Sequence, residues 1–170
     1  MELLKSSINQ FAANKEVILQ LLSNLPEEEI HWKQAPEKWN LLEIICHLYD
    51  EEREDFRARL TSVLEDQEKA FATIDPAGWV SSRKYAAQNF EHMLREFTAE
   101  REKSIRFLHT LENASWQNVY RHPKIGPMSA TFILANWLAH DYLHIRQVLK
   151  LKYDYLQAVS GESLKYAGDW

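Results

Sequence analysis

Long amphipathic segments make up most of this chain and limit the folds that it can adopt. In residues 3–25, apolar side chains recur at three- and four-residue steps, the period of an α-helix with one buried face. Helices are also predicted over residues 41–65, 82–111 and 130–152, and no segment shows the alternation of a convincing β-strand. Four helices of this length predict an all-α protein built as a four-helix bundle.

Capping residues and helix breakers mark the ends of the first two helices. Pro26 closes the first helix, and residues 26–39 form a linker. Asn40 is then a good N-cap, and Glu43 stands at the third helical position, so the pair approximates a capping box. The second helix is therefore expected to start directly after Asn40.

Two longer connections separate the remaining helices. Residues 66–79 contain Asp-Pro and Gly breakers, and residues 112–129 end in a Gly-Pro pair and in Ser129, which can cap the fourth helix. The first connection suits a crossover better than a tight hairpin, so the predicted topology is up-down-down-up. The polar middle of the third helix, residues 95–104, is expected on the outside or beside a cavity. The aromatic tail 153–170 is expected to pack back on the body.

Composition is that of an ordinary globular protein and argues against several functions. With 170 residues, 45% of them hydrophobic and 26% charged, the chain is expected to form one domain over residues 1–170. A net charge of −5 argues against binding to a nucleic-acid backbone. The single cysteine, Cys46, cannot form an internal disulfide, which fits a reducing cytoplasm. Neither a signal peptide nor the ~20-residue apolar run of a membrane-spanning helix is visible.

Two histidines one turn apart stand out in the fourth helix. His140 and His144 lie on one face, in a stripe with apolar ends and a polar middle. The stripe consists of Ile133, Asn136, Trp137, His140, His144, Gln147 and Leu151. Buried imidazoles need partners, and two at this spacing can direct nitrogens at one metal ion. Such pairs also occur by chance on exposed helices, and the spacing alone leaves that interpretation open.

His47 in the second helix is a candidate third ligand. It lies at the edge of an apolar face formed by Leu41, Ile44, Ile45, Leu48 and Phe56. Histidines on two facing helices, with a second one a turn along, match the way in which bundles hold metal ions in their cores. A lone histidine here can equally be a core residue with satisfied hydrogen bonds, and the carboxylates that follow it a solvated face.

Two segments together resemble the DinB/YfiT-like superfamily of metal-binding four-helix bundles. Residues 38–52, KWNLLEIICHLYDEE, are similar to that family's W-[ST]-x-x-E-x-x-x-H-L segment, with Asn40 in place of Ser or Thr. Residues 126–147 are similar to its G-x-x-[ST]-x(10)-H-D-x-x-H-x-x-Q segment. The resemblance spans essentially the whole chain, although the first and third helices carry little specific signal.

The resemblance implies an up-down-down-up bundle with three metal ligands, His47, His140 and His144. It also implies a divalent metal, with zinc, nickel and iron as candidates. The better-understood relatives are thiol-dependent enzymes: bacillithiol transferases, mycothiol-dependent maleylpyruvate isomerases and glutathione transferases. A homodimer is expected from the family and from the many aromatic residues, which include six Trp and seven Tyr.

The leading hypothesis is an S-transferase-like enzyme. Three histidine ligands leave coordination positions open, so the metal can hold a low-molecular-weight thiol cosubstrate as thiolate for attack on a small electrophile. Glu51 is a candidate acid–base or fourth ligand, and Gln147 can hydrogen-bond a ligand or close the helix packing. Asp141 can orient a histidine on a neighbouring element. Surface charge is the alternative for both carboxylates, and Cys46 points away and is not expected to be the nucleophile.

Three other interpretations stay open. The sequence HDYLH at 140–144 matches the H-E-x-x-H of zincins with Asp in the Glu position, but Asp is one methylene shorter and no zincin sheet is predicted. A metal-dependent hydrolase is therefore the weaker enzyme hypothesis. A non-catalytic bundle that binds a metal, or a ligand in a pocket lined by Trp137 and Tyr142, is the main alternative. The last is a structural bundle without metal.

Overall fold

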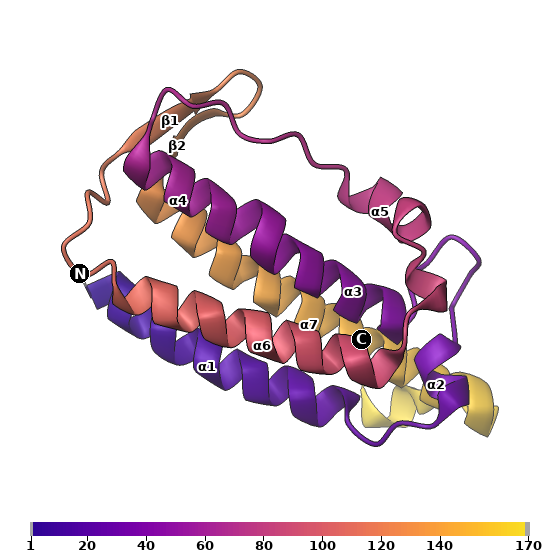
Figure 1. Ribbon diagram of the computed structural model, residues 1–170. Coiled ribbons are helices and arrows are strands. Elements are labelled where there is room, and N and C mark those ends of the chain that lie inside the picture. Colours follow the sequence, from indigo (N-terminus) through magenta and orange to yellow (C-terminus); the bar gives the residue numbers. More distant parts are fainter. Residues whose placement is uncertain (1, 169–170) are drawn as a thin grey trace.

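The computed structural model describes residues 2–168, and its long helices follow the predicted segments (Figure 1). The long elements are α1 (Glu2–Leu22), a rod made of α3 (Leu41–Glu51), a π-helical turn (Glu52–Phe56) and α4 (Arg57–Glu65), then α6 (Phe90–His109) and α7 (Ala130–Ser160). The short helical elements are α2 (Glu27–His31), α5 (Pro76–Ser82) and two 3₁₀ turns (Tyr85–Ala87 and Leu164–Ala167).

The long helices run up, down, down and up, which confirms the predicted topology. In Figure 1, α1 and α7 run in one direction, and the α3–α4 rod and α6 run in the other. The connection from α4 to α6 carries α5 and returns along the length of the bundle. This crossover lets α3 and α6 pack side by side in parallel.

Side-chain caps explain two helix starts that were predicted correctly. The Asn40 side-chain oxygen accepts from the Glu43 N–H at 2.9 Å, and the Glu43 carboxylate accepts from the Asn40 N–H at 3.0 Å. The capping box is therefore complete. At the start of α7, Ser129 Oγ accepts from the Phe132 N–H at 3.0 Å.

The third helix starts at Phe90, so the predicted start at Ser82 is wrong. Ser82 ends α5, and Lys84 follows with a left-handed φ of +51° that no helix can continue through. Asn89 then caps α6, because its side-chain oxygen accepts from the His92 N–H at 2.8 Å. The end of α5, the 3₁₀ turn Tyr85–Ala87 and α6 thus occupy the segment that was predicted as one helix.

The last helix is longer than predicted, and only the first part of the tail packs on the body, where the Tyr155 ring lies 5.8 Å from the Trp32 ring. α7 runs on to Ser160 rather than to residue 152 and ends at Gly161, the first residue there that takes a left-handed φ (+68°) at no steric cost. Residues 161–168 are mostly exposed, with Leu164 half-buried. The expectation that the tail packs on the body is wrong for this part, and its last two residues, 169–170, lie outside the described range.

A short β-hairpin stands in the segment before α7, where only a loop was predicted. β1 (Val119–His122) pairs antiparallel with β2 (Gly126–Ser129). The buried side chain of Met128 and the contact of Tyr120 with Phe71, 4.1 Å between ring centres, fix the hairpin across one end of the bundle. Strands of four residues are too short to show a period in the sequence.

The core consists of two apolar clusters with a polar layer between them. The cluster near α2 includes Leu22, Ile44, Phe97 and Leu151, and the cluster near the hairpin includes Phe11, Leu60, Leu134 and Trp137. All four long helices contribute buried polar side chains between these clusters: Asn14, His47, Glu52, Arg101, Asp141 and His144. Buried polar groups cost free energy unless they are paired, so this layer is where a function is expected.

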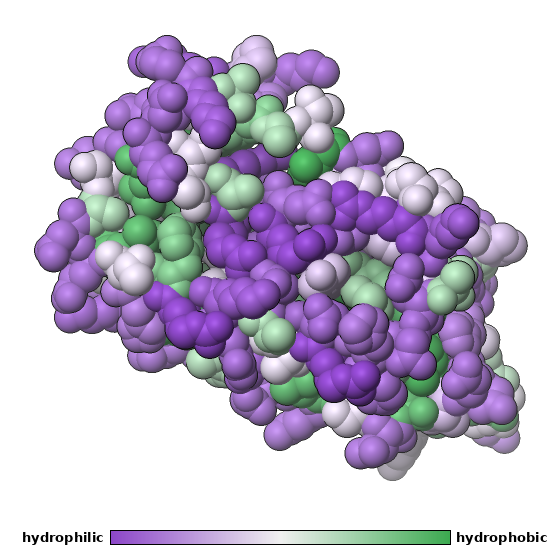
Figure 2. Space-filling model, in the orientation of Figure 1, coloured by the Kyte–Doolittle hydropathy of each residue, from purple (hydrophilic) through white to green (hydrophobic). Residues whose placement is uncertain are grey.

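The outer surface has the character expected for a chain that folds around an internal core. Figure 2 shows a face covered mostly by hydrophilic residues, with apolar ones in separate patches. Within residues 2–168, no helix has both the length and the apolar character needed to cross a membrane.

Candidate metal centre

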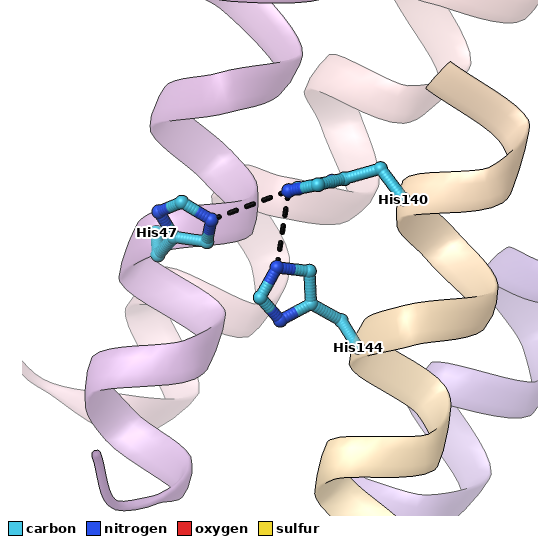
Figure 3. A group of neighbouring side chains, drawn as sticks. All are labelled: His47, His140 and His144. Carbon is cyan, nitrogen blue, oxygen red and sulfur yellow. Dashed lines mark hydrogen bonds between the residues drawn. The ribbon is translucent and has the colours of Figure 1, made fainter. Parts of the chain in front are cut away.

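Three histidines meet in the polar layer (Figure 3). His47 projects from α3, and His140 and His144 project from successive turns of α7. The Nε2 atom of His140 lies 3.4 Å from Nε2 of His47 and 3.0 Å from Nε2 of His144. One ligand atom from each side chain lies within 4.8 Å of the other two. The fold therefore brings the three predicted ligands together.

Burial keeps these imidazoles neutral at neutral pH. Removal from water lowers the pKa of His47 to about 3, and the nearby His144 lowers it as well. Burial is also the largest cause that lowers the pKa of His140, to about 2, and His144, His47 and Arg101 lower it further. Burial also lowers the pKa of His144. A neutral imidazole is the form that binds a metal ion, so no proton has to be removed first.

The donor set fits a divalent metal. His144 Nδ1 lies 2.8 Å from the side-chain oxygen Oε1 of Gln147, so Nδ1–H donates and the lone pair is left on Nε2. The Nε2 atoms of the described histidines here face only one another, and a shared cation would satisfy all three. Imidazole nitrogens suit zinc, nickel and iron.

A groove beside the histidines gives the cluster access to solvent. It has a volume of about 750 Å³ and lies between α7 and the connection that precedes α3. His144 and Gln147 line it, together with Trp39. The Trp39 ring also packs on His47, with 4.8 Å between ring centres. The groove therefore has a candidate metal ligand, His144, and an aromatic ring, Trp39, among its lining residues.

A comparison with known families agrees with this geometry. The sequence model of the DinB superfamily matches residues 10–148, a range that includes all three histidines. The chain belongs to the DinB superfamily. The resemblance drawn from the two sequence segments is thereby confirmed. None of the curated proteins is similar enough in sequence to match this chain.

A solved structure supports the same fold for this DinB-superfamily chain. YfiT from Bacillus subtilis, described as a probable metal-dependent hydrolase with an unusual four-helix bundle topology, matches with a TM-score of 0.78. The match covers 94% of this chain and 89% of YfiT at 15% sequence identity. At that identity the likeness shows the fold alone, and the fold is the predicted four-helix bundle.

Glu51, the predicted acid–base or fourth ligand, is buried rather than a surface charge. Its carboxyl donates a hydrogen bond to Asp55, and burial together with this neighbour raises the pKa of Glu51 to about 8. Among the described residues, no carboxylate joins the three histidines in a set of ligand atoms within 4.8 Å of one another. Glu51 thus holds a proton at neutral pH and lies beside another acid.

Asp141 is fully buried, and it binds Arg101 rather than a histidine. Two hydrogen bonds of 2.6 and 2.7 Å join its carboxylate to the Arg101 guanidinium. On its other side, Arg101 binds Glu52 at 2.7 and 2.9 Å. Asn14 donates to Asp141 at 3.1 Å, and Trp137 donates to Glu52 at 3.1 Å. The expectations of a histidine-orienting role and of surface charge for Asp141 are both wrong.

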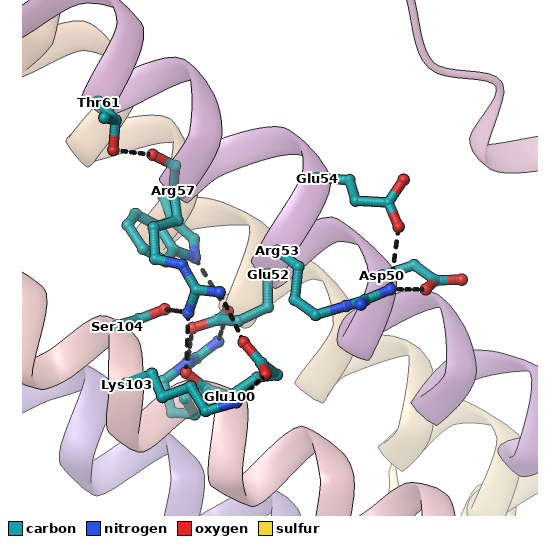
Figure 4. Close-up of polar contacts among 11 residues, drawn as sticks. Asp50, Glu52, Arg53, Glu54, Arg57, Thr61, Glu100, Lys103 and Ser104 are labelled. Atoms are coloured by element: carbon teal, nitrogen blue, oxygen red, sulfur yellow. Dashed lines mark hydrogen bonds and ion pairs between the residues drawn. The ribbon is translucent and has the colours of Figure 1, made fainter. Parts of the chain in front are cut away.

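The π-helical turn of the α3–α4 rod supplies part of this network. Within it, Glu52 faces α6, and the Phe56 ring packs on His140 with 5.0 Å between ring centres. Figure 4 shows Glu52 beside a second contact across the same helices, in which Arg57 binds Glu100 at 2.6 Å. The middle of α6 was predicted to lie outside or beside a cavity; one face of it is exposed as expected, and its other face buries two charged residues, Glu100 and Arg101. π-helical turns often occur at functional sites.

Cys46 is also buried, and it is a poor nucleophile as predicted. Burial raises the pKa of its thiol to about 12, with Asp50 and Glu43 as lesser causes. A thiol with such a pKa holds its proton at neutral pH, and the thiolate is the reactive form.

Three residues of the site and of the buried network beside it were not singled out in the sequence: Trp39, Arg101 and Glu52.

Replacing Gln147 by Leu in this DinB-superfamily chain is expected to weaken zinc binding by about 10–100-fold. The variant removes the acceptor that fixes the tautomer of His144. The measurement is a competition titration of zinc against a chromophoric chelator. Gln147→Glu keeps an acceptor and serves as the matched control, for which affinity close to that of the wild type is expected. Wild-type affinity in Gln147→Leu would show that the hydrogen bond does not support the ligand.

Acid is expected to destabilise the metal-free protein through the same histidines. The pKa of His47 falls to about 3 on folding, whereas the unfolded chain has an ordinary histidine pKa of ~6.5. Between these values only the unfolded state takes up the proton, so stability drops as the pH falls below ~6.5, by roughly 2 kcal/mol at pH 5 for one histidine. Above ~6.5 both states are neutral and the contribution vanishes.

The check is the free energy of unfolding at pH 5 and pH 7, in the presence of chelator. The difference between the two pH values should be smaller in His47→Leu than in the wild type, because the variant lacks one depressed group. His92→Leu, an exposed position on α6, serves as the control and should keep the wild-type difference. Equal pH dependence in all three proteins would contradict the prediction.

Proposed function

We propose that this DinB-superfamily protein is a metal-dependent enzyme that joins a low-molecular-weight thiol to a small electrophile. The observation that carries the proposal is the cluster of three neutral histidines beside an open groove. Three protein ligands leave a coordination position for a ligand from solution. A divalent metal bound there lowers the pKa of a thiol and so supplies a thiolate at neutral pH.

The chain's own residues have separate tasks in this proposal. His47, His140 and His144 hold the metal, and Gln147 fixes the tautomer of His144. Sulfur forms a bond to a carbon of the electrophile, and the displaced group leaves with its bonding electrons. Where the reaction is instead an addition, the product takes up a proton, and Glu51 is the candidate donor because its carboxyl is protonated at neutral pH.

A metal-dependent hydrolase is the second candidate, and the description of YfiT as a probable one favours it. Hydrolases of the zincin type need a carboxylate as general base next to the metal's water. Asp141 has the corresponding place in the sequence, but both of its oxygens bind Arg101. A thiolate is itself the nucleophile and needs no such base, so the geometry favours the thiol-dependent reaction.

The test is the rate at which thiols displace chloride from chlorodinitrobenzene in the presence of the zinc- or nickel-loaded protein. Bacillithiol, mycothiol, glutathione and cysteine are compared in the wild type, His144→Ala and the exposed control His92→Ala. At least one thiol is expected to react faster with the wild type and His92→Ala than with His144→Ala. Above neutral pH this rate should change little, because the thiol is already ionised. No difference for any thiol across several electrophile classes would favour a non-catalytic metal- or ligand-binding bundle.

A homodimer and a cytoplasmic location stay predictions. Several apolar side chains of α7 are exposed and available to a second copy of the chain: Phe132, Tyr142, Leu143, Leu149 and Leu156. Burial of such side chains against another protein surface would favour association.

A further inference from the structure

The groove beside the histidines is basic, although the chain as a whole has a net charge of −5. Lys38, Arg146 and Lys150 line it, and no acidic residue among the described residues 2–168 does. Lys150 is neutralised by Asp154, to which it donates at 2.5 and 2.6 Å. Lys38 and Arg146 are exposed and form no ion pair with the described residues. Two unpaired cations therefore border the groove.

These cations stand on opposite walls of the groove. Lys38 belongs to the connection before α3, next to Trp39, and Arg146 belongs to α7, next to Gln147. Cations around a concave site raise the local concentration of anionic ligands. The guanidinium fork of Arg matches the two oxygens of a carboxylate or phosphate. Gln147 uses its carbonyl oxygen toward His144, so its NH₂ group is left as a further donor.

We propose that this groove selects substrates that carry an oxyanion, a carboxylate or a phosphate, at the end remote from the group that reaches the histidines. This inference rests on the proposed function and names its substrate class. Lys38 and Arg146 bind the oxyanion, and Trp39 packs against the part of the substrate between the oxyanion and the histidines. The same oxyanion relieves the repulsion between two like charges that face one groove.

The experiment uses zinc-loaded protein and three small thiols of similar size in isothermal titration calorimetry. These are 3-mercaptopropionate, 3-mercapto-1-propanol and cysteamine, which carry an anion, no charge and a cation. The wild type is expected to bind the propionate about tenfold more tightly than the propanol, with cysteamine weakest. In the double variant Lys38→Gln/Arg146→Gln, the propionate should lose this advantage while the propanol binds as before.

A matched control removes two exposed cations from the β-hairpin at the other end of the bundle. Arg121→Gln/Lys124→Gln changes the net charge by the same amount, and it should keep the wild-type preference. Circular dichroism confirms that both variants fold. Equal binding of the propionate and the propanol to the wild type would overturn the inference but leave the proposed function standing, because both thiols bind.

If none of the three thiols binds, the proposed function fails, and the groove is then titrated with succinate and with inorganic phosphate. Tighter binding of either anion to the wild type than to Lys38→Gln/Arg146→Gln supports the oxyanion site independently of thiol chemistry. The anion that binds more tightly, succinate or phosphate, identifies the preferred oxyanion as a carboxylate or a phosphate. Failure of both anions to bind would overturn the inference.

Discussion

Replacing Arg101 by Met is expected to lower the free energy of unfolding by about 3–5 kcal/mol. Arg101 is 1% exposed and pairs with Glu52 and Asp141, which are 2% and 0% exposed. The variant leaves two carboxylates in the core without their cation. Desolvation then acts on them with no compensating attraction, and the helices that carry them, the α3–α4 rod and α7, lose the residue on α6 that joins them.

Urea denaturation followed by circular dichroism measures this loss. Arg95→Met, an exposed position on the same helix, is the matched control and should change stability by less than about 0.5 kcal/mol. Adding Glu52→Gln and Asp141→Asn to Arg101→Met removes the orphaned charges and should recover part of the lost stability. A loss below about 1 kcal/mol in Arg101→Met would mean that water reaches the network and solvates the carboxylates.

Replacing any one of His47, His140 and His144 by Ala is expected to weaken zinc binding by more than about a hundredfold, because the loss of a supporting hydrogen bond alone costs 10–100-fold. The three Nε2 atoms face one another from two helices, so two remaining ligands cannot replace the third. The apolar clusters on both sides of the site do not depend on the metal, and the variants should remain helical.

Zinc affinity is measured by competition with a chelator, and bound metal by mass spectrometry after dialysis. His92→Ala and His109→Ala on α6 are the controls, and both should bind zinc as the wild type does. Full metal occupancy in His47→Ala would remove α3 from the site. It would leave only the histidine pair of α7, which the sequence alone cannot distinguish from a chance pair.

Local signals in the sequence predicted most of the fold. The helical period located the four long helices, and the caps at Asn40 and Ser129 fixed two of their starts. These signals depend on neighbours within one helical turn, so a single sequence carries them. The histidines were found in the same way, because His140 and His144 interrupt an apolar stripe. That His47 meets them depended on the resemblance to a family and on the packing of α3 against α7.

Features that depend on partners far away in the sequence were missed. Arg101 stands in a strongly polar segment, and no residue near it in the sequence indicates that it is buried and binds Glu52 and Asp141. The π-helical turn has no proline or glycine to mark it. The groove is lined by Lys38 and Arg146, which are far apart in the chain. They line the same groove only because the connection before α3 lies beside α7, and the sequence alone does not show this.

X-ray absorption spectroscopy of the metal-loaded protein, purified without a metal-affinity resin, tests the central claim most directly. About three imidazole nitrogens are expected at ~2.0–2.1 Å from zinc, together with an additional light ligand that exchanges with solvent. Addition of a reactive thiol should introduce a sulfur neighbour at ~2.3 Å, and His144→Ala should abolish the signal of the bound metal. A zinc ion with four ligands from the protein, unchanged by any thiol, would contradict the open three-histidine site and point to a structural metal.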